Sequence, residues 1–427
     1  MMNKLSPTSN STSSINTEPN YKPAFAAVTL LFFMWGMMTS LNDILVPHFK
    51  AIFELSYTQV MLIQFTFFAA YFVMSLPAGK ITALIGYKKG IVVGLVTAGI
   101  GALMFYPAAG FPSYPLFLTA LFVLASGITL LQVTANPYVT VLGKPETASS
   151  RLNLTQGFNS LGHTLAPYLG GLFILSAATL SWEEVKKLGP AELTAYKLAE
   201  ASAVQMPYII LAGTLFLLAI TMALFKLPVI AKVEDHHAKA GTLRDALKHR
   251  HLVLGAIGIF LYVGAEVSIG SFLVNFFGEP NIAGLKEAAA APFVSYYWGG
   301  AMVGRFIGSA LLQKFNPQKM LAVCALITST LVVITILSSG PVAMWTILSV
   351  GLFNSVMFPI IFTLGVDGLG KLTSAGSSIL IMAIVGGAII PVAQGALADT
   401  IGIHHAFILP ALCYLYVVWY GLKGSAH

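Results

Sequence analysis

Charged residues are scarce in this chain, and their scarcity limits the class of protein to which it can belong. Asp, Glu, Lys and Arg make up 9% of the 427 residues, while 57% are hydrophobic. In an ordinary soluble domain roughly a quarter of the residues are charged. Too little charge is present to solvate a globular surface, which excludes a water-soluble fold.

The alternating ten-residue segments of a membrane barrel are also missing. The apolar runs are instead continuous for twenty residues and more, and about 20 such residues span a bilayer as a helix. Lipid cannot satisfy backbone hydrogen bonds, so each run is predicted to be helical. The expected spans are residues 23–50, 57–85, 90–110, 114–142, 151–178, 205–230, 251–278, 289–314, 318–338, 341–369, 373–401 and 404–423.

Signatures of an enzyme or a metal centre are absent from the sequence. It has neither a His-Glu-x-x-His nor a Gly-x-Ser-x-Gly motif, and Cys324 and Cys413 lie in apolar spans without metal-ligand spacing. We therefore expect two inert thiols, no cofactor and no enzymatic activity. Residues 1–22 are polar and lack a compact apolar stretch before a cleavage site, so we expect no signal peptide to be removed.

The basic residues that are present favour alternate loops. With both termini in the cytoplasm, 18 of the 23 basic residues fall in the tails and inner loops, which indicates an even number of spans. The net charge of +7 is therefore interpreted as membrane topology and not as nucleic-acid binding. The outer loops keep Lys50, Lys186, Lys187, Lys197 and Lys286.

The two halves of the chain repeat one pattern. Pro137 precedes a Leu-Gly pair with the same spacing as Pro359, and Gly162, Pro167 and Gly171 recur as Gly386, Pro391 and Gly395. This predicts an all-α membrane protein of twelve transmembrane helices in two parallel six-helix repeats, the major facilitator architecture, with its substrate site between the halves. The expected parts are a cytoplasmic tail (1–22), an N-terminal bundle (23–230), a cytoplasmic linker (231–250) and a C-terminal bundle (251–427).

Two acidic residues, Asp43 and Glu266, lie well inside apolar runs. A charge at the centre of a bilayer costs about 2.5–3.5 kcal/mol on insertion scales, so such residues usually face a polar cavity. The alternative is a structural salt bridge, but no lysine or arginine lies deep in a span to act as a partner. Thr39 and Asn42 lie on the same side of the first helix as Asp43, which favours a small cation or a proton site there.

Amide side chains line two further spans at helical spacing. Gln132 and Asn136 are four residues apart, and Gln156, Asn159 and His163 form a second stripe. Amides both donate and accept hydrogen bonds, as sugar hydroxyls require, and aromatic rings such as Trp298 can pack on sugar C–H faces. The stripes indicate a polyhydroxylated ligand.

The chain resembles the fucose, galactose and glucose symporters of the major facilitator superfamily, most closely the bacterial glucose/galactose permeases. The resemblance is carried by the stretches 42–47, 135–143 and 151–160 and continues at 262–266, 304–306 and 376–378. It implies hexose uptake across the inner membrane by alternating access, driven by a cation. It also implies that Asp43 is the essential first-helix aspartate and Gln156 a sugar contact; Asn136 and Asn159 lie in the same motifs.

One departure bears on the cation. The proton-coupled fucose branch has a glutamate where this chain has Gln132, which cannot titrate. Our hypothesis is Na+ coupling, with Na+ bound at Asp43 and assisted by Thr39 and Gln132, while Glu266 supplies a second acidic group. The alternatives are H+-coupled transport of fucose or another sugar such as an N-acetylhexosamine, and a sugar sensor that does not transport.

The predicted assignments are therefore as follows. The partners are a hexose, Na+ or H+, and membrane lipid, without nucleic acid, and the protein is expected to be a monomer in the bacterial inner membrane with both termini cytoplasmic. The predicted sugar contacts are Asn42, Gln64, Asn136, Gln156, Asn159, Glu266, Trp298 and Asn354.

Overall fold

The computed structural model consists of helices joined by short connections. It describes residues 21–53, 57–110, 113–174, 187–225 and 242–426, with side chains except at 41–53, 57–61, 167–174, 197, 200–204, 287–288 and 291. The α-helices are α1 (Lys22–Phe53), α2 (Tyr57–Gly110), α3 (Tyr114–Val141), α4 (Ala148–Ile174), α6 (Pro190–Leu224), α7 (Leu243–Ala246), α8 (Arg250–Gly278), α9 (Glu287–Leu311), α10 (Pro317–Leu337), α11 (Gly340–Asn354), α12 (Met357–Val366), α13 (Thr373–Met382), α14 (Gly386–Ile401), α15 (Ile403–Ala406) and α16 (Ile408–Trp419).

The described helices account for twelve membrane crossings. Nine helical segments are long and apolar enough to cross a membrane. One of them is α2, whose 54 residues would extend about 80 Å, more than twice the thickness of a hydrocarbon core, and Gly86 breaks it with a φ of 79°. Counting α2 as two crossings, and adding α4 with 27 residues and α9 with 25, gives twelve.

Several predicted boundaries differ from the structure. The sixth span is expected to start near residue 205, but α6 begins at Pro190, so residues 190–204, which include Lys197 of the predicted outer loop, continue the membrane helix. The tenth span divides into α11 and α12, and the eleventh into α13 and α14 with the 3₁₀ turn η3 (Ala383–Val385) between them. Continuous hydrophobicity cannot reveal these breaks, because it does not depend on backbone dihedral angles.

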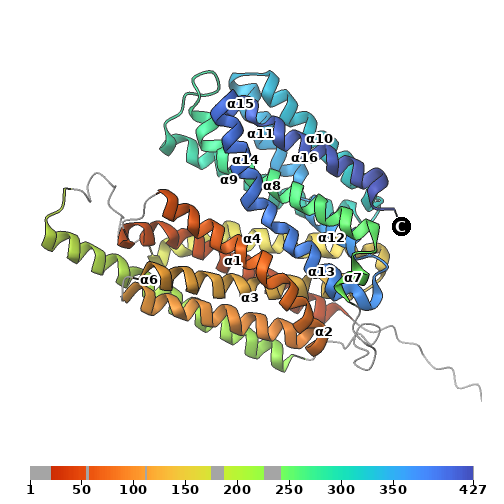
Figure 1. The fold of residues 1–427 in the computed structure, drawn as a ribbon, viewed down its shortest axis with the longest axis horizontal. Coiled ribbons are helices and arrows are strands. Elements are labelled where there is room, and N and C mark those ends of the chain that lie inside the picture. The colour runs from red at the N-terminus through yellow and green to blue at the C-terminus, as the bar shows by residue number, and fades with distance from the viewer. Residues whose placement is uncertain (1–20, 54–56, 111–112, 175–186, 226–241, 427) are drawn as a thin grey trace, which may run out of the picture.

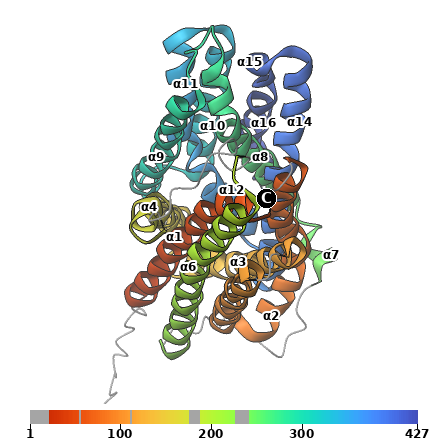
Figure 2. The same ribbon diagram turned by 90° about the vertical axis from the view of Figure 1, so that its left-hand side faces the viewer.

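The helices form two bundles that meet at one end. Helices α1 to α6 make the first and α8 to α16 the second, and they converge where α7, α12, α13 and the C-terminus lie (Figure 1). Towards α15 and the start of α6 the two ribbons diverge. Helix α4 of the first bundle lies beside α9 of the second, as the rotated view also shows (Figure 2).

Close glycine contacts occur at equivalent positions of both bundles. A Cβ added to Gly162 in α4 would lie 2.1 Å from the carbonyl oxygen of Phe33, and one added to Gly386 in α14 would lie 2.0 Å from that of Phe260. Glycine allows backbones to approach this closely, and this packing replaces the hydrophobic effect as the force that joins helices in lipid. The predicted sequence repeat therefore corresponds to one type of helix crossing that occurs in both bundles.

The turn between α3 and α4 depends on one arginine. Arg151 donates from Nη2 to the carbonyl of Thr140 at 2.7 Å, from Nε to that of Val139 at 3.2 Å, and from Nη1 to that of Lys144 at 2.9 Å. The last carbonyls of a helix have no partner within the helix, and a guanidinium has enough donors to bind several of them. Arg151 therefore fixes the direction in which α4 leaves α3.

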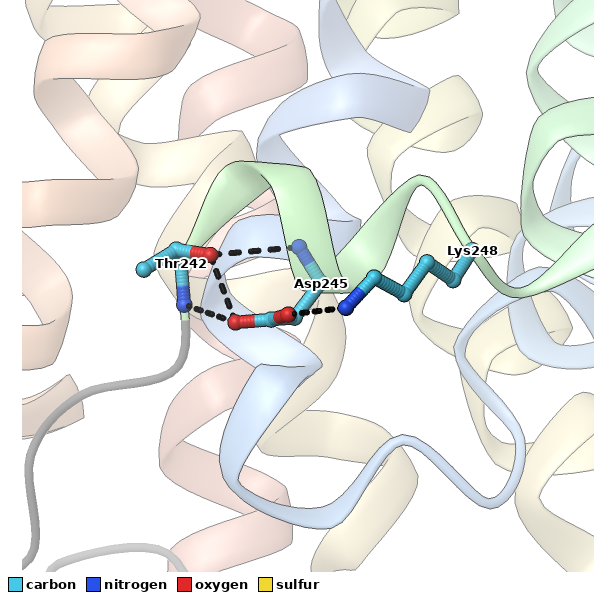
Figure 3. A network of polar contacts seen from close by, with 3 residues as sticks. All are labelled: Thr242, Asp245 and Lys248. Atoms are coloured by element: carbon cyan, nitrogen blue, oxygen red, sulfur yellow. Dashed lines mark hydrogen bonds and ion pairs between the residues drawn. The ribbon is translucent and has the colours of Figure 1, made fainter.

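The second bundle starts with a capped single turn, α7. The Thr242 hydroxyl accepts from the Asp245 N–H at 3.2 Å and donates to Oδ2 of the same residue at 2.6 Å, while Lys248 donates to Oδ1 at 2.7 Å (Figure 3). The hydrogen bond and charge of Lys248, followed by the hydrogen bond from Thr242, lower the pKa of Asp245 to about 2. This capping box fixes the chain just before α8; residues 231–241 of the predicted linker lie outside the described part.

We expect Gly386→Ala to lower the free energy of unfolding by about 1–3 kcal/mol, because its methyl group would collide with the Phe260 carbonyl. The matched control is Gly213→Ala in α6, where an added Cβ meets nothing within 4 Å. That control should be neutral or stabilise by up to about 1 kcal/mol. Thermal unfolding of the full chain in detergent measures both variants, and equal melting temperatures would contradict the crossing.

Replacing Asp245 by Asn should expose the first turn of α7 at pH 7, because it removes the acceptor of Thr242 and Lys248. The pKa of Asp245 lies below its ordinary value of 3.8, so its stabilisation is complete above pH 3.8 and disappears as the pH falls through about 2. Hydrogen exchange of peptides covering 242–249 should be several-fold faster in the variant. In the native chain, protection should stay constant from pH 7 to pH 5; a loss within that range would contradict the lowered pKa.

Candidate functional site

Hydroxyl groups join the two bundles at their converging end. Ser149 of α4 and Thr363 of α12 have their oxygens 2.6 Å apart. Ser150 donates to the Ser309 carbonyl at 2.7 Å, and Ser309 donates back to the Ser150 carbonyl at 3.1 Å. All four side chains are buried. We call these contacts, with those of the next two paragraphs, the seam.

Two repeated prolines supply acceptors for the seam. Pro137 has no N–H, so the carbonyl of Val133 four residues earlier is free, and Ser377 of α13 donates to it at 2.9 Å. The equivalent Pro359 frees the carbonyl of Ser355, which accepts from Nε of Arg305 at 3.3 Å. Pro137 therefore provides a carbonyl acceptor for a hydrogen bond between the two bundles. Pro359 provides one for Arg305, which lies in the same bundle and extends towards the first.

Arg305 in α9 crosses the seam. Its Nη1 donates to the hydroxyl of Ser160, and its own carbonyl accepts from the Asn153 amide at 2.6 Å; both partners lie in α4. The guanidinium also interacts electrostatically with Glu266 and His163. Among the described residues no ion pair joins Arg305 to Glu266, so the expected absence of a structural salt bridge is not contradicted, but Arg305 lies within α9 and not in an inner loop as predicted, and its charge acts on Glu266.

A cavity of about 500 Å³ lies between the bundles, away from the seam. Its lining comes from the start of α2, the end of α8 and the middle of α14, including Gln64, Asn275 and Pro391. Because α8 starts beside α7 at the converging end and finishes near Asn275, the cavity lies towards the diverging end. The bundles are thus joined at one end with a cavity towards the other, and a second cavity of about 560 Å³ lies beside the seam, lined in part by Ser149, Thr363 and Asp367. Of the predicted sugar contacts, Gln64 lines this cavity.

Two of the predicted amides of the first bundle, Asn136 and Gln156, come together between α3 and α4, while Gln132 and Asn159 bind α2 and α1. Nε2 of Gln156 lies 3.5 Å from Oδ1 of Asn136, whose Nδ2 is buried and has no hydrogen-bond partner among the described residues. Gln132 donates to the hydroxyl of Tyr71 at 2.7 Å, and Asn159 donates to the Phe32 carbonyl at 3.0 Å. The cluster keeps hydrogen-bonding capacity, while Asn159 also ties α4 to α1.

The second bundle holds a carboxylate within a tyrosine network, which we define as Tyr262, Tyr297, Asn354 and Tyr414. The Tyr262 hydroxyl donates to Oε1 of Glu266 at 2.7 Å, and the Tyr297 hydroxyl donates to the Glu266 carbonyl at 3.2 Å. Asn354 donates from Nδ2 to the hydroxyls of Tyr297, at 2.9 Å, and Tyr414, at 3.3 Å. Sequence reasoning missed these partners, although the four-residue spacing of Tyr262 and Glu266 was a usable signal.

The remaining predicted residues are placed differently. Trp298 is 40% exposed and lies against Gly270, while Asn354 is fully buried behind the tyrosines. The Thr39 hydroxyl donates to the carbonyls of Trp35 and Gly36, so its oxygen lone pairs stay available. The side chains of Asn42 and Asp43, and with them the predicted cation ligand, lie outside the described residues.

Comparisons with known proteins identify relatives over nearly the full chain. A model of the Major Facilitator Superfamily matches residues 27–391. The chain is 57% identical to the glucose/galactose transporter of Brucella abortus over 96% of both chains. It is 37% identical to the L-fucose-proton symporter of Escherichia coli over 92% of this chain and 91% of that one. The crystal structure of the transporter FucP in the outward conformation matches with a TM-score of 0.90 and 36% identity over 95% of this chain and 100% of that chain.

The seam predicts a specific cross-link. Ser149→Cys combined with Thr363→Cys should form a disulfide on mild oxidation, because the native oxygens are 2.6 Å apart and a disulfide needs Cβ atoms about 3.5–4.5 Å apart. Peptide mass spectrometry of the full chain in lipid measures the bond. The single variants are the controls, since the native Cys324 and Cys413 both lie in the second bundle. A double variant that stays reduced would contradict the closed seam.

Proposed function

Because the chain belongs to the Major Facilitator Superfamily, we propose that it is a secondary active hexose symporter that works by alternating access. The observation that carries the proposal is the arrangement of the two bundles: hydroxyls hydrogen-bond them together at one end, and a cavity with mainly apolar walls lies between them towards the other. The names of the relatives, a glucose/galactose transporter and a fucose-proton symporter, support a sugar as the cargo.

The proposed sugar site lies between the bundles. Asn136, Gln156 and Asn159 provide amides from the first bundle, because amides can both donate to and accept from a hydroxyl. Glu266 and Trp298 provide an acceptor and an aromatic face from the second. Asn42, Gln64 and Asn354 complete the proposed set, with Gln64 at the cavity and Asn354 behind the tyrosines.

Alternating access requires the seam to open and re-form. Each neutral hydrogen bond contributes a net stabilisation of only about 0.5–1.5 kcal/mol, since water replaces it when the halves separate. Most contacts of the seam join hydroxyls and carbonyls, and Arg305 adds a charged donor that binds the Ser160 hydroxyl. The closed and open states can therefore lie close in free energy, as a carrier needs.

We place Na+ at Asp43, assisted by Thr39 and Gln132. Gln132 cannot exchange a proton, and the hydrogen bond from Gln132 to Tyr71 leaves the amide oxygen free to act as a ligand. Na+ binding would stabilise the state that accepts hexose, and the coupling between the two ligands is reciprocal.

Proton coupling is the second candidate, favoured by the name of the E. coli relative, an L-fucose-proton symporter. In that case Asp43 takes up the proton outside and releases it inside, and fucose or an N-acetylhexosamine is an alternative cargo. In either case we place the protein in a bacterial inner membrane as a monomer, with both termini cytoplasmic and the predicted domain limits of 23–230 and 251–427.

The test is transport by the full chain in proteoliposomes, with Na+ and pH varied independently. An inward Na+ gradient should drive accumulation of labelled glucose or galactose, and Asp43→Asn should abolish it. Gln156→Ala should raise KM about tenfold, because it removes a hydrogen bond of the site. Gln205→Ala is the matched control, since that amide donates to the Tyr106 carbonyl in an exposed position.

Three outcomes decide between the candidates. If accumulation depends on a pH gradient and does not respond to a sudden increase in external Na+, the coupled ion is H+ and not Na+. Binding of hexose without any counterflow would indicate a sensor. If no hexose were bound or transported, the proposed function would be wrong.

A further inference from the structure

Glu266 is a buried carboxylate with unused hydrogen-bonding capacity. The residue is 8% exposed, and Tyr262 binds its Oε1 at 2.7 Å. Within the described residues, Oε2 accepts no hydrogen bond, and no cationic side chain lies within 4.0 Å to form an ion pair. A carboxylate has about four lone-pair sites, so most of its acceptor capacity is left for a ligand.

The donors and acceptors of the hydrogen bonds in the tyrosine network around Glu266 are fixed. Asn354 gives both Nδ2 protons to tyrosine hydroxyls, so Tyr297 must direct its own proton elsewhere, and it donates to the Glu266 carbonyl. The Oδ1 of Asn354 is buried and has no hydrogen-bond partner in the part of the chain that the structure describes. These bonds connect α8, α9, α11 and α16 around one residue. Both the main chain and Oε1 of Glu266 are therefore held.

We propose that Glu266 recognises two adjacent hydroxyls of the hexose, and that the tyrosine network positions its carboxylate to do so. This inference rests on the hexose transport proposed above. An ionised carboxylate only accepts hydrogen bonds, so it requires a ligand with paired donors, and a vicinal diol supplies two. Charge-assisted hydrogen bonds of this kind are about twice as strong as neutral ones.

The charge of the site also defines the class of sugar. The negative charge of Glu266 repels an anionic ligand, and the Arg305 guanidinium, whose charge also acts on Glu266, forms no ion pair with it among the described residues, so neutral sugars are favoured over sugar phosphates and uronic acids. The amides of Asn136 and Gln156 accept and donate, and therefore discriminate less between hydroxyl patterns. Glu266 thus selects neutral hexoses with two free neighbouring hydroxyls.

The experiment compares hexoses that lack one hydroxyl each. Counterflow by the full chain in proteoliposomes is measured for glucose and its 2-, 3-, 4- and 6-deoxy analogues, using the native chain, Glu266→Gln, Tyr262→Phe and Tyr420→Phe. In the native chain, two neighbouring deoxy positions should raise KM about 10- to 100-fold. In Glu266→Gln, glucose should lose affinity by a similar factor, and those two analogues should no longer differ from it.

The tyrosine variants test positioning. Tyr262→Phe should raise KM for glucose several-fold and weaken discrimination at the same two positions, with kcat changed less than KM. Tyr420→Phe removes an equally buried hydroxyl, which donates to the His251 carbonyl, and should leave the deoxy pattern unchanged.

Unaltered KM and deoxy patterns in Glu266→Gln and Tyr262→Phe would overturn the inference, as would equal changes for every analogue or a loss of kcat alone. If Glu266→Gln fails to fold, Tyr262→Phe decides by itself, with direct sugar binding as its readout. A native chain that transports hexose while the variants behave alike would overturn this inference and keep the proposed function. A native chain that transports no hexose would overturn the function itself.

Discussion

Lipid offers no hydrogen bonds, and this constraint decides where the polar side chains of the molecule lie. A polar group facing hydrocarbon costs several kcal/mol, so the polar groups of the spans gather inside the bundles or between them. Ser149, Ser150 and Ser309 are all buried between α4 and the second bundle. The same constraint places the amides of the first bundle and Glu266 of the second within protein.

The two bundles resemble each other in scaffold and differ in chemistry. The glycine crossings at Gly162 and Gly386 match, and so do the prolines of the fourth and tenth spans. The first bundle, however, holds an amide cluster, and the second holds a carboxylate among tyrosines. A duplicated scaffold thus carries different polar groups in its two halves, amides in the first and a carboxylate with tyrosines in the second.

Much of the fold could be predicted from the amino-acid composition and from the repeat of the sequence pattern in the two halves of the chain. The scarcity of charge, the length of the apolar runs and the repeat around Pro137 and Pro359 predicted the major facilitator fold; the family match confirms that fold, and twelve helices are what the family implies. The predicted resemblance to sugar symporters is also confirmed. The break between α11 and α12 was not predictable, because it depends on local dihedral angles within an apolar run.

The site was only partly predictable. Asn136 and Gln156, chosen for their helical spacing, do lie 3.5 Å apart, and their role as sugar contacts stays a prediction. The reach of Arg305 across the seam was missed, because a side chain of that length connects helices that are far apart in the sequence. The hydroxyl partners of Asn354 were missed for the same reason, since Tyr297 and Tyr414 come from two other spans.

The carbonyls freed by Pro137 and Pro359 have an evolutionary consequence. Both acceptors belong to the main chain, at Val133 and Ser355, so the two contacts do not use the side chains of these fully buried residues. A substitution at residue 133 or 355 that fits its buried site would keep the contact, whereas loss of either proline would return its carbonyl to the helix. Selection for these two contacts of the seam therefore acts on Pro137 and Pro359, each of which lies four residues after the carbonyl that it frees.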